Sequence, residues 1–189
     1  MNFSPLNSTG RIFHVENIFP ESLVDEVLNL NWDSLPWSRT KKQESWSRRS
    51  IHPDQHPSLQ NVSTYIWDHL EEIEVACGVK FHIRYPSTLW WYDEPGFEVS
   101  LHTDGHLPST MQLFWQAPSK EFATQFYSFK NINSPISNLE FVPNTGYLML
   151  NMPNEDGSQP LHWHAMLNTV PENTIRITSY TTFGTYENK

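Results

Sequence analysis

The spacing of apolar residues divides the chain into a helical first part and a strand-rich second part. Between Pro20 and Leu30 the apolar positions fall on one face of a helix, with an acidic residue in the first turn, which predicts a short helix. From Ser58 to Gly78 apolar residues recur every three or four positions, which predicts a longer helix that ends at the glycine. The apolar positions of this longer helix are Leu59, Val62, Ile66, Leu70 and Ile73.

The segment between these helices, residues 32–57, is polar and interrupted by prolines, so we predict a long loop or irregular arm. Loops of this length are often functional. A solvated surface loop is the ordinary interpretation of its basic residues. The alternative is recognition of a phosphate or carboxylate group, or of nucleic acid through charge and stacking. The basic residues are Arg39, Lys41, Lys42, Arg48 and Arg49, with Trp37 and Trp46 interleaved.

After Gly78 the pattern changes to short β-branched and aromatic runs separated by Pro, Gly, Asn and Asp. About eight such strands behind two helices predict a mostly-β chain with N-terminal helices, an α+β fold whose core is a double-stranded β-helix, or cupin-like jelly roll. Turns are expected at residues 93–96 and 143–146. The predicted strands are residues 80–92, 97–104, 110–116, 122–129, 139–142, 146–151, 160–167 and 174–184.

Length and composition limit the remaining possibilities. The 189 residues suit a single domain, with residues 1–78 packing on a jelly-roll core of residues 79–189. The net charge of −9 disfavours nonspecific binding to nucleic acid, and no run approaches the roughly 20 apolar residues that a membrane span needs. The lone Cys77 is typical of a reducing compartment, so we expect a cytoplasmic protein without a membrane partner. The oligomeric state stays open.

The motif His102-Thr103-Asp104 predicts a metal site. Residues two apart in a strand point to the same side, so both side chains can bind one ion while Thr103 points away. Neutral imidazole and carboxylate ligands suit iron(II) and leave coordination positions open. The similar motif at residues 52–54 has a proline between the two candidate ligands and lies in the polar loop, which favours an ordinary solvated segment.

A third ligand must come from another strand. His162 and His164 alternate with Leu161 and Trp163, so both are candidates. We prefer His164, because it lies further inside the predicted strand and closer along the chain to Arg176.

Arg176 alternates with two isoleucines and shares its face with Thr178 and Tyr180. An arginine inside a jelly roll needs an anion, because an unpaired buried guanidinium is very costly, and a carboxylate matches its geometry. The alternative is an arginine on the wet outer face of an edge strand.

Over residues 80–184 the sequence resembles the iron(II) and 2-oxoglutarate-dependent dioxygenases, particularly their prolyl-4-hydroxylase-like branch. The order and spacing of the motifs are more specific than any one of them. Twelve positions lead from His164 to Arg176, slightly more than relatives often have, so residues 168–173 are expected to carry an insertion. The resemblance is carried by Tyr92 ten residues before His102, by Pro95-Gly96, by His102-Thr103-Asp104, by His164, and by Arg176 with Thr178.

The resemblance implies that His102, Asp104 and His164 hold iron(II). It implies further that Arg176, assisted by Thr178 and Tyr92, binds the distal carboxylate of 2-oxoglutarate. The implied enzyme is a hydroxylase that uses O2, releases succinate and CO2, and is supported by ascorbate. Its substrate stays open among small molecules, amino acids and peptides. Two alternatives from other classes are a cupin-like metal enzyme that does not use 2-oxoglutarate and a noncatalytic jelly-roll module that binds a ligand.

Overall fold

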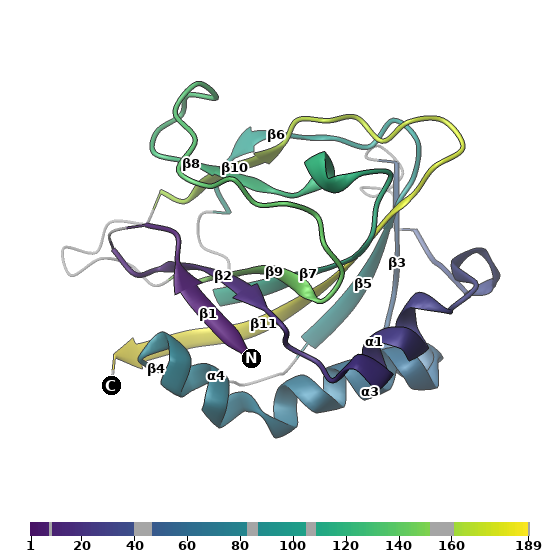
Figure 1. Ribbon diagram of the computed structural model, residues 1–189, viewed down its shortest axis with the longest axis horizontal. Helices are drawn as coiled ribbons and strands as arrows, with labels where there is room; N and C mark the ends of the chain where they lie inside the picture. Colours follow the sequence, from purple (N-terminus) through teal and green to yellow (C-terminus); the bar gives the residue numbers. More distant parts are fainter. Residues whose placement is uncertain (8, 40–46, 83–86, 105–108, 152–160, 189) are drawn as a thin grey trace.

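Two antiparallel β-sheets and a layer of α-helices build the fold (Figure 1). The structure, a computed structural model, describes residues 1–7, 9–39, 47–82, 87–104, 109–151 and 161–188. The larger sheet has eight strands in the order β1-β2-β9-β7-β11-β5-β3, with β4 paired to β11, and the smaller sheet has the order β6-β10-β8. The strands are β1 Asn2–Pro5, β2 Ile12–Glu16, β3 Arg48–Ile51, β4 Val79–His82, β5 Ser87–Asp93, β6 Val99–His102, β7 Ser109–Gln116, β8 Gln125–Tyr127, β9 Thr145–Met149, β10 Trp163–Met166 and β11 Arg176–Asn188.

The described α-helices are α1 Glu21–Leu28, α3 Pro57–Asp68 and α4 Leu70–Cys77, and they lie on one side of the larger sheet (Figure 1). The single helix predicted for residues 58–78 is therefore two helices. They are separated at His69, whose φ of −108° and ψ of 18° leave the helical region. Gly78 ends α4 in the left-handed conformation, as its position in the sequence predicts.

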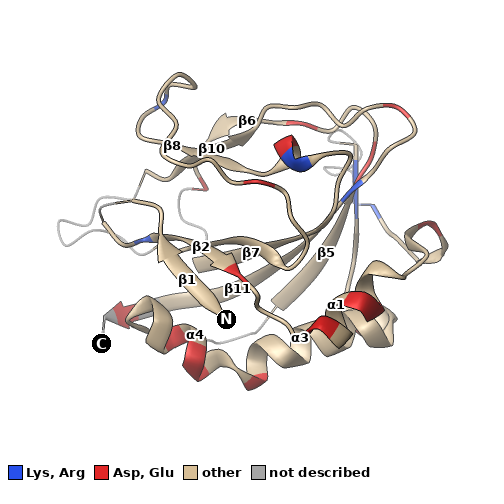
Figure 2. Cartoon of the chain, viewed as in Figure 1, with Lys and Arg blue, Asp and Glu red and all other residues tan. Residues whose placement is uncertain are grey.

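The helices are acidic, and none of the three contains a lysine or arginine (Figure 2). Together they hold seven of the 21 acidic residues of the chain. Within the described residues, every helix is too short or too polar to cross a membrane.

The prediction of a mostly-β chain with a double-stranded β-helix is confirmed, but several strands differ. The predicted strand at residues 139–142 is wrong, because Phe141 donates its N–H to the carbonyl of Lys120 in a loop and joins no ladder. Leu139 and Phe141 instead pack in the core between the sheets. The prediction that residues 32–57 form only a loop is also wrong, because β3 pairs with β5 at the sheet edge. Strands β1 and β2 were not expected.

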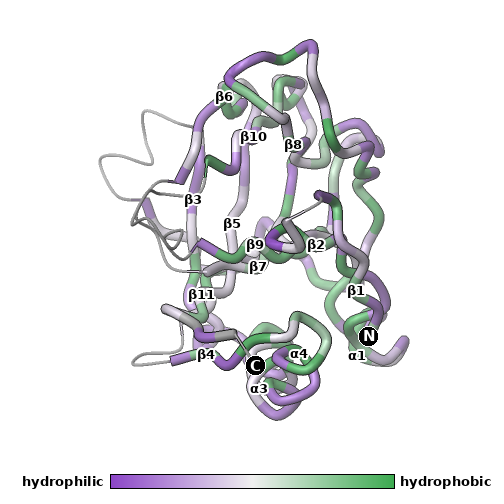
Figure 3. Tube along the Cα trace, turned by 90° about the vertical axis from the view of Figure 1, so that its left-hand side faces the viewer, coloured by the Kyte–Doolittle hydropathy of each residue, from purple (hydrophilic) through white to green (hydrophobic). Residues whose placement is uncertain are grey.

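Each face of the larger sheet contacts a different layer. On the helix side, one apolar cluster includes Trp90, Trp115 and Ile66, and on the other side a second cluster includes Phe114 and Phe126. Viewed from the side, the helices, the larger sheet and the smaller sheet form successive layers (Figure 3). Side chains that alternate along β5, β7 and β11 thus point either toward the helices or into the space between the sheets.

Both predicted turns are present. After Asp93, the N–H of Phe97 donates to the carbonyl of Glu94 (3.0 Å) and Gly96 takes a φ of 87°, which glycine adopts without steric cost. The turn at residues 143–146 has Asn144 at a φ of 62°. The first of these turns matters for the site, because it ends β5 at the buried Asp93.

Candidate metal centre and its cavity

Three side chains that can bind a metal meet on the smaller sheet. His102 is the last residue of β6 and His164 is its register partner on β10, while Asp104 follows two residues after His102. The Nε2 atoms of His102 and His164 lie 3.5 and 3.7 Å from Oδ1 of Asp104. One ligand atom from each residue lies within 4.8 Å of the other two, so these residues, called here the metal triad, have the spacing of a single-ion site.

Backbone carbonyls orient both histidines of the metal triad. Nδ1–H of His102 donates to the carbonyl of Ser100, and Nδ1–H of His164 donates to the carbonyl of His162, each at 2.8 Å. In the neutral form of each ring, this pairing leaves Nε2 without a proton and directed toward Asp104. Such an outer hydrogen bond on the far ring nitrogen is the usual way in which a metal-binding histidine is held. The donor set therefore fits a divalent metal such as iron(II).

The two histidines have different protonation behaviour. The hydrogen bond with Asp104 raises the pKa of His102 above its usual value, whereas burial lowers the pKa of His164. Burial by itself would raise the pKa of Asp104, but its hydrogen bond with His102 and the nearby histidine charges lower it overall. Near neutral pH the triad therefore offers a carboxylate, one neutral imidazole and one imidazole that retains a proton more readily.

His164 and not His162 reaches the triad. His162 precedes β10, and a tight turn there joins the N–H of Trp163 to the carbonyl of Leu161 (3.0 Å), so the alternation of a strand does not extend to it. Its Nε2 lies 3.0 Å from the carbonyl of Leu150, away from the triad. The other His-x-Asp motif, at residues 52–54, forms no such group of three ligands with other described residues.

A cavity of about 680 Å³ opens beside the metal triad and is also lined by Arg48 and Arg176 from the larger sheet. Tyr147 and Tyr180 also line this cavity. The pKa of Tyr147 is raised first by burial and then by Asp104, while Arg176 opposes the rise. Burial and then Asp104 likewise raise the pKa of Tyr180, while Arg48 opposes the rise. The metal triad and the two arginines thus line the same cavity.

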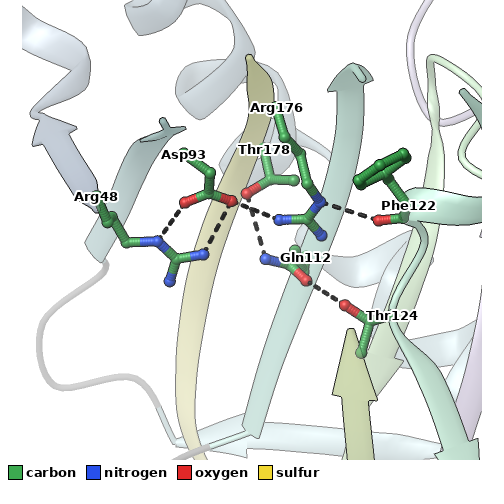
Figure 4. A network of polar contacts seen from close by, with 7 residues as sticks. All are labelled: Arg48, Asp93, Gln112, Phe122, Thr124, Arg176 and Thr178. Atoms are coloured by element: carbon green, nitrogen blue, oxygen red, sulfur yellow. Dashed lines mark hydrogen bonds and ion pairs between the residues drawn. The ribbon is translucent and has the colours of Figure 1, made fainter. Parts of the chain in front are cut away.

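Arg48, Asp93 and Arg176 form a row across three adjacent strands (Figure 4). Asp93 on β5 is the register partner of Arg48 on β3 and of Arg176 on β11. Arg48 donates through Nε and Nη2 to the two oxygens of Asp93, and Nη1 of Arg176 donates to Oδ2 of Asp93 at 2.7 Å. Nε of Arg176 donates to the carbonyl of Phe122 at 3.0 Å. We call these three residues the arginine row.

The guanidinium of Arg48 is held on its faces as well as its edge. Its central carbon lies 3.7 Å from the ring centre of Trp91 and 4.1 Å from that of Phe97. Burial lowers the pKa of Arg48, and Asp93 opposes this shift. The sequence interpretation did not place Arg48 beside Arg176 and did not single out Asp93, although a charged residue at the end of an apolar strand was a signal for Asp93.

Thr178 lies next to the arginine row, where its buried hydroxyl accepts a hydrogen bond from Nε2 of Gln112 (3.2 Å; Figure 4). Tyr92 does not. It lies one position from Asp93, so its ring points to the helix-side core, and its hydroxyl donates to Oδ1 of Asp33 (2.6 Å). This position does not fit the contact with the cosubstrate that the resemblance implies for Tyr92.

The described members of the basic cluster are paired within the chain. Arg39 and Arg49 both form ion pairs with Glu94, beside the pairing of Arg48 with Asp93. Trp37 packs against Tyr92. Lys41, Lys42 and Trp46 lie outside the described residues.

No protein-family model matches the chain, and no curated protein matches it in sequence. Solved structures do match it over nearly its whole length. A viral collagen prolyl hydroxylase from Paramecium Bursaria Chlorella virus-1, solved with 2-oxoglutarate, is 12% identical, covers 94% of this chain and 97% of its own, and has a TM-score of 0.57.

Two bacterial proteins are similar to the same extent. A prolyl-4-hydroxylase from Pseudomonas putida is 12% identical, with 93% of this chain and 92% of that chain covered and a TM-score of 0.60. An oxidoreductase of the 2OG-Fe(II) oxygenase family from Burkholderia pseudomallei is 11% identical, with 95% and 88% covered and a TM-score of 0.62. The chain therefore has the fold of the prolyl-4-hydroxylases and other iron(II) and 2-oxoglutarate-dependent oxygenases, and in that fold it carries a His-x-Asp…His triad.

Proposed function

We propose that this protein is an iron(II) and 2-oxoglutarate-dependent oxygenase that hydroxylates a small molecule, an amino acid or a peptide. The observation that carries the proposal is the metal triad, whose free Nε2 atoms and carboxylate face a cavity that also contains a buried arginine. The viral relative was solved as a complex with 2-oxoglutarate, which supports the same cosubstrate here.

His102, Asp104 and His164 would hold the metal through two imidazole nitrogens and one carboxylate oxygen. Three protein ligands leave coordination positions for a cosubstrate and for O2. Bound iron would couple O2 and 2-oxoglutarate to C–H oxidation, so that one oxygen atom enters succinate, CO2 leaves and the other atom becomes the hydroxyl of the product. The carbonyls of Ser100 and His162 would fix the imidazole rings during this chemistry.

Arg176 is our candidate for binding the distal carboxylate of 2-oxoglutarate. Its Nε and Nη1 are engaged by Phe122 and Asp93, and among the described residues no acceptor is bonded to Nη2. That nitrogen can donate to one carboxylate without breaking an existing bond. Thr178, on the same strand face, offers a hydroxyl nearby, which we propose adds a second contact.

The size of the cavity supports a compact substrate. About 680 Å³ is in the usual range for small-molecule sites and holds the cosubstrate together with a small molecule or a single side chain. Trp91, Phe97 and Tyr147 supply apolar surface to the walls. These side chains would keep bulk water away from the reacting atoms.

Production of succinate from 2-oxoglutarate tests the proposal. We expect turnover that needs iron(II), is supported by ascorbate and is raised by the correct member of a broad panel of amino acids, peptides and small metabolites. Asp104→Asn is expected to abolish it, and Asp54→Asn, in the other His-x-Asp motif, is the matched control. Absence of succinate with every member of the panel would count against the proposal.

The two alternatives give different results. A cupin-like metal enzyme without this cosubstrate would keep its activity in Arg176→Met. A noncatalytic module would bind its ligand equally well after metal removal and in Asp104→Asn.

A further inference from the structure

The arginine row has one more positive charge than negative charge. Arg48, Asp93 and Arg176 are 8%, 0% and 1% exposed, so water does little to screen them. An uncompensated charge in such surroundings is costly, and an anion that neutralises it is bound strongly. One bound group with a single negative charge would therefore neutralise the row.

The contacts indicate which arginine carries the spare charge. Arg48 binds both oxygens of Asp93, so these two groups form a neutral, two-bond pair. Arg176 reaches only Oδ2 of Asp93, at 2.7 Å, and keeps Nη2 without an acceptor among the described residues. The positive charge that remains is thus concentrated on Arg176.

The same contacts show what Arg48 prevents. Without Arg48, the carboxylate of Asp93 would neutralise Arg176 alone, and the row would have no charge left for an incoming anion. Arg48 can act in this way without touching the anion, because Nε and Nη2 are bound to Asp93 and its faces are covered by Trp91 and Phe97. Its Nη1, like Nη2 of Arg176, has no acceptor among the described residues, and the double variant below separates a direct contact through this nitrogen from the effect on Asp93.

We propose that Arg48 is a positioning residue that makes the site selective for a dicarboxylate cosubstrate, by binding Asp93 and so leaving the charge of Arg176 available for the distal carboxylate. The inference rests on the proposed function of Arg176. It adds that the selectivity depends on the balance of charge in the whole row and not on Arg176 alone.

The experiment compares two 2-oxo acids by calorimetry, with the full chain loaded with manganese(II) so that no turnover occurs. One is 2-oxoglutarate, and the other is 2-oxopentanoate, which has the same chain length but a methyl group in place of the distal carboxylate. The ratio of the Kd of 2-oxopentanoate to the Kd of 2-oxoglutarate isolates the contribution of that carboxylate, and a high ratio means that the site prefers the dicarboxylate. A variant that merely disturbs the structure weakens both acids and leaves the ratio unchanged.

We expect Arg48→Met to lower the ratio by about 10–100-fold, the range for a charge-assisted hydrogen bond. Methionine keeps an unbranched apolar chain, so the space between the rings of Trp91 and Phe97 stays filled. The double variant Arg48→Met/Asp93→Asn removes one charge of each sign. We expect it to restore the ratio to within about threefold of wild type, the scatter of such cycles.

Each failure has a separate meaning. If the wild type binds neither acid, or binds both equally, the proposed function is overturned and this inference with it. If the wild type discriminates and Arg48→Met keeps its ratio, or the double variant stays as low as Arg48→Met, the inference alone is overturned.

A second variant serves if Arg48→Met does not fold. Asp93→Asn alone increases the spare charge while keeping an amide oxygen as acceptor, so we expect a ratio no lower than that of wild type. A lower ratio in this variant overturns the proposal. Circular dichroism and manganese binding verify that each variant is folded.

Discussion

The two sides of the cavity are built in opposite ways. The metal triad, on the smaller sheet, has its outer nitrogens bound to backbone carbonyls and its inner ligand atoms turned toward one another. The arginine row, on the larger sheet, is largely satisfied within the chain, since Asp93 is bonded to both arginines. The triad thus needs a cation from outside, whereas the row has only one charge to offer a ligand.

This difference teaches how each side contributes to the protein. Removing a member of the triad takes a ligand from the metal and leaves the fold largely unaffected. Removing Asp93, the one acidic member of the row, leaves two buried guanidinium groups without their anionic partner, which costs stability.

The largest expected effect on stability is that of Asp93→Ala. It leaves two buried guanidinium groups unpaired, and we expect a loss of about 3–5 kcal/mol in the free energy of unfolding. Urea denaturation measures it. The matched control is Glu94→Ala, because Glu94 also pairs with two arginines but these are 35% and 39% exposed, so we expect about 1 kcal/mol or less. Equal losses in the two variants would contradict the difference between row and surface.

Asp104→Asn is expected to have the largest effect on metal binding. The loss of a direct ligand should lower manganese(II) affinity by more than the roughly 10–100-fold that follows the loss of an outer hydrogen bond. Thermal stability without metal should stay close to that of wild type. Asp54→Asn is the control and should leave the affinity unchanged, because Asp54 is exposed and apart from the triad. Similar affinity in both variants would remove Asp104 from the site.

Metal affinity should also fall as the pH is lowered. The pKa of His102 is raised by Asp104, and a metal binds only the neutral imidazole, so protons compete with the metal at this residue. Below that pKa we expect a decrease of about tenfold per pH unit. His164 adds little, because burial lowers its pKa and keeps it neutral. Calorimetry from about pH 7.5 to about pH 5.5, the range in which histidine titrates, measures the effect, and a constant affinity would contradict it.

The smallest effect is expected for Tyr92→Phe. The variant removes the hydrogen bond to Asp33, which is worth about 0.5–1.5 kcal/mol in unfolding free energy. The affinity for 2-oxoglutarate should not change, because Tyr92 lies on the helix side of β5. A large drop in that affinity would place Tyr92 at the cosubstrate after all, as the resemblance to the dioxygenases implies.

The sequence predicted the metal triad better than the arginine row, for a physical reason. His102 and Asp104 are close in the chain, and the alternation of a strand is enough to bring their side chains together. The row depends on β3 and β11 flanking β5 in one register, which no local pattern encodes. For the same reason Arg48 was interpreted as part of a polar loop.

The fold shows the same limit. Gly78 and the turn at residues 93–96 were predictable, because glycine at these positions relieves a steric conflict that the local chain imposes. The strand expected at residues 139–142 was wrong, since apolar residues that fill a core have the same composition whether or not they join a ladder. The sequence offered no way to choose between these two cases.

The central claim is that the triad and Arg176 together form one site for a metal and a 2-oxo acid. Titration of 2-oxoglutarate into the protein, with and without manganese(II), tests it most directly. We expect binding that requires the metal and that is lost in Arg176→Met. Binding of equal strength without metal, or unchanged in that variant, would contradict the claim.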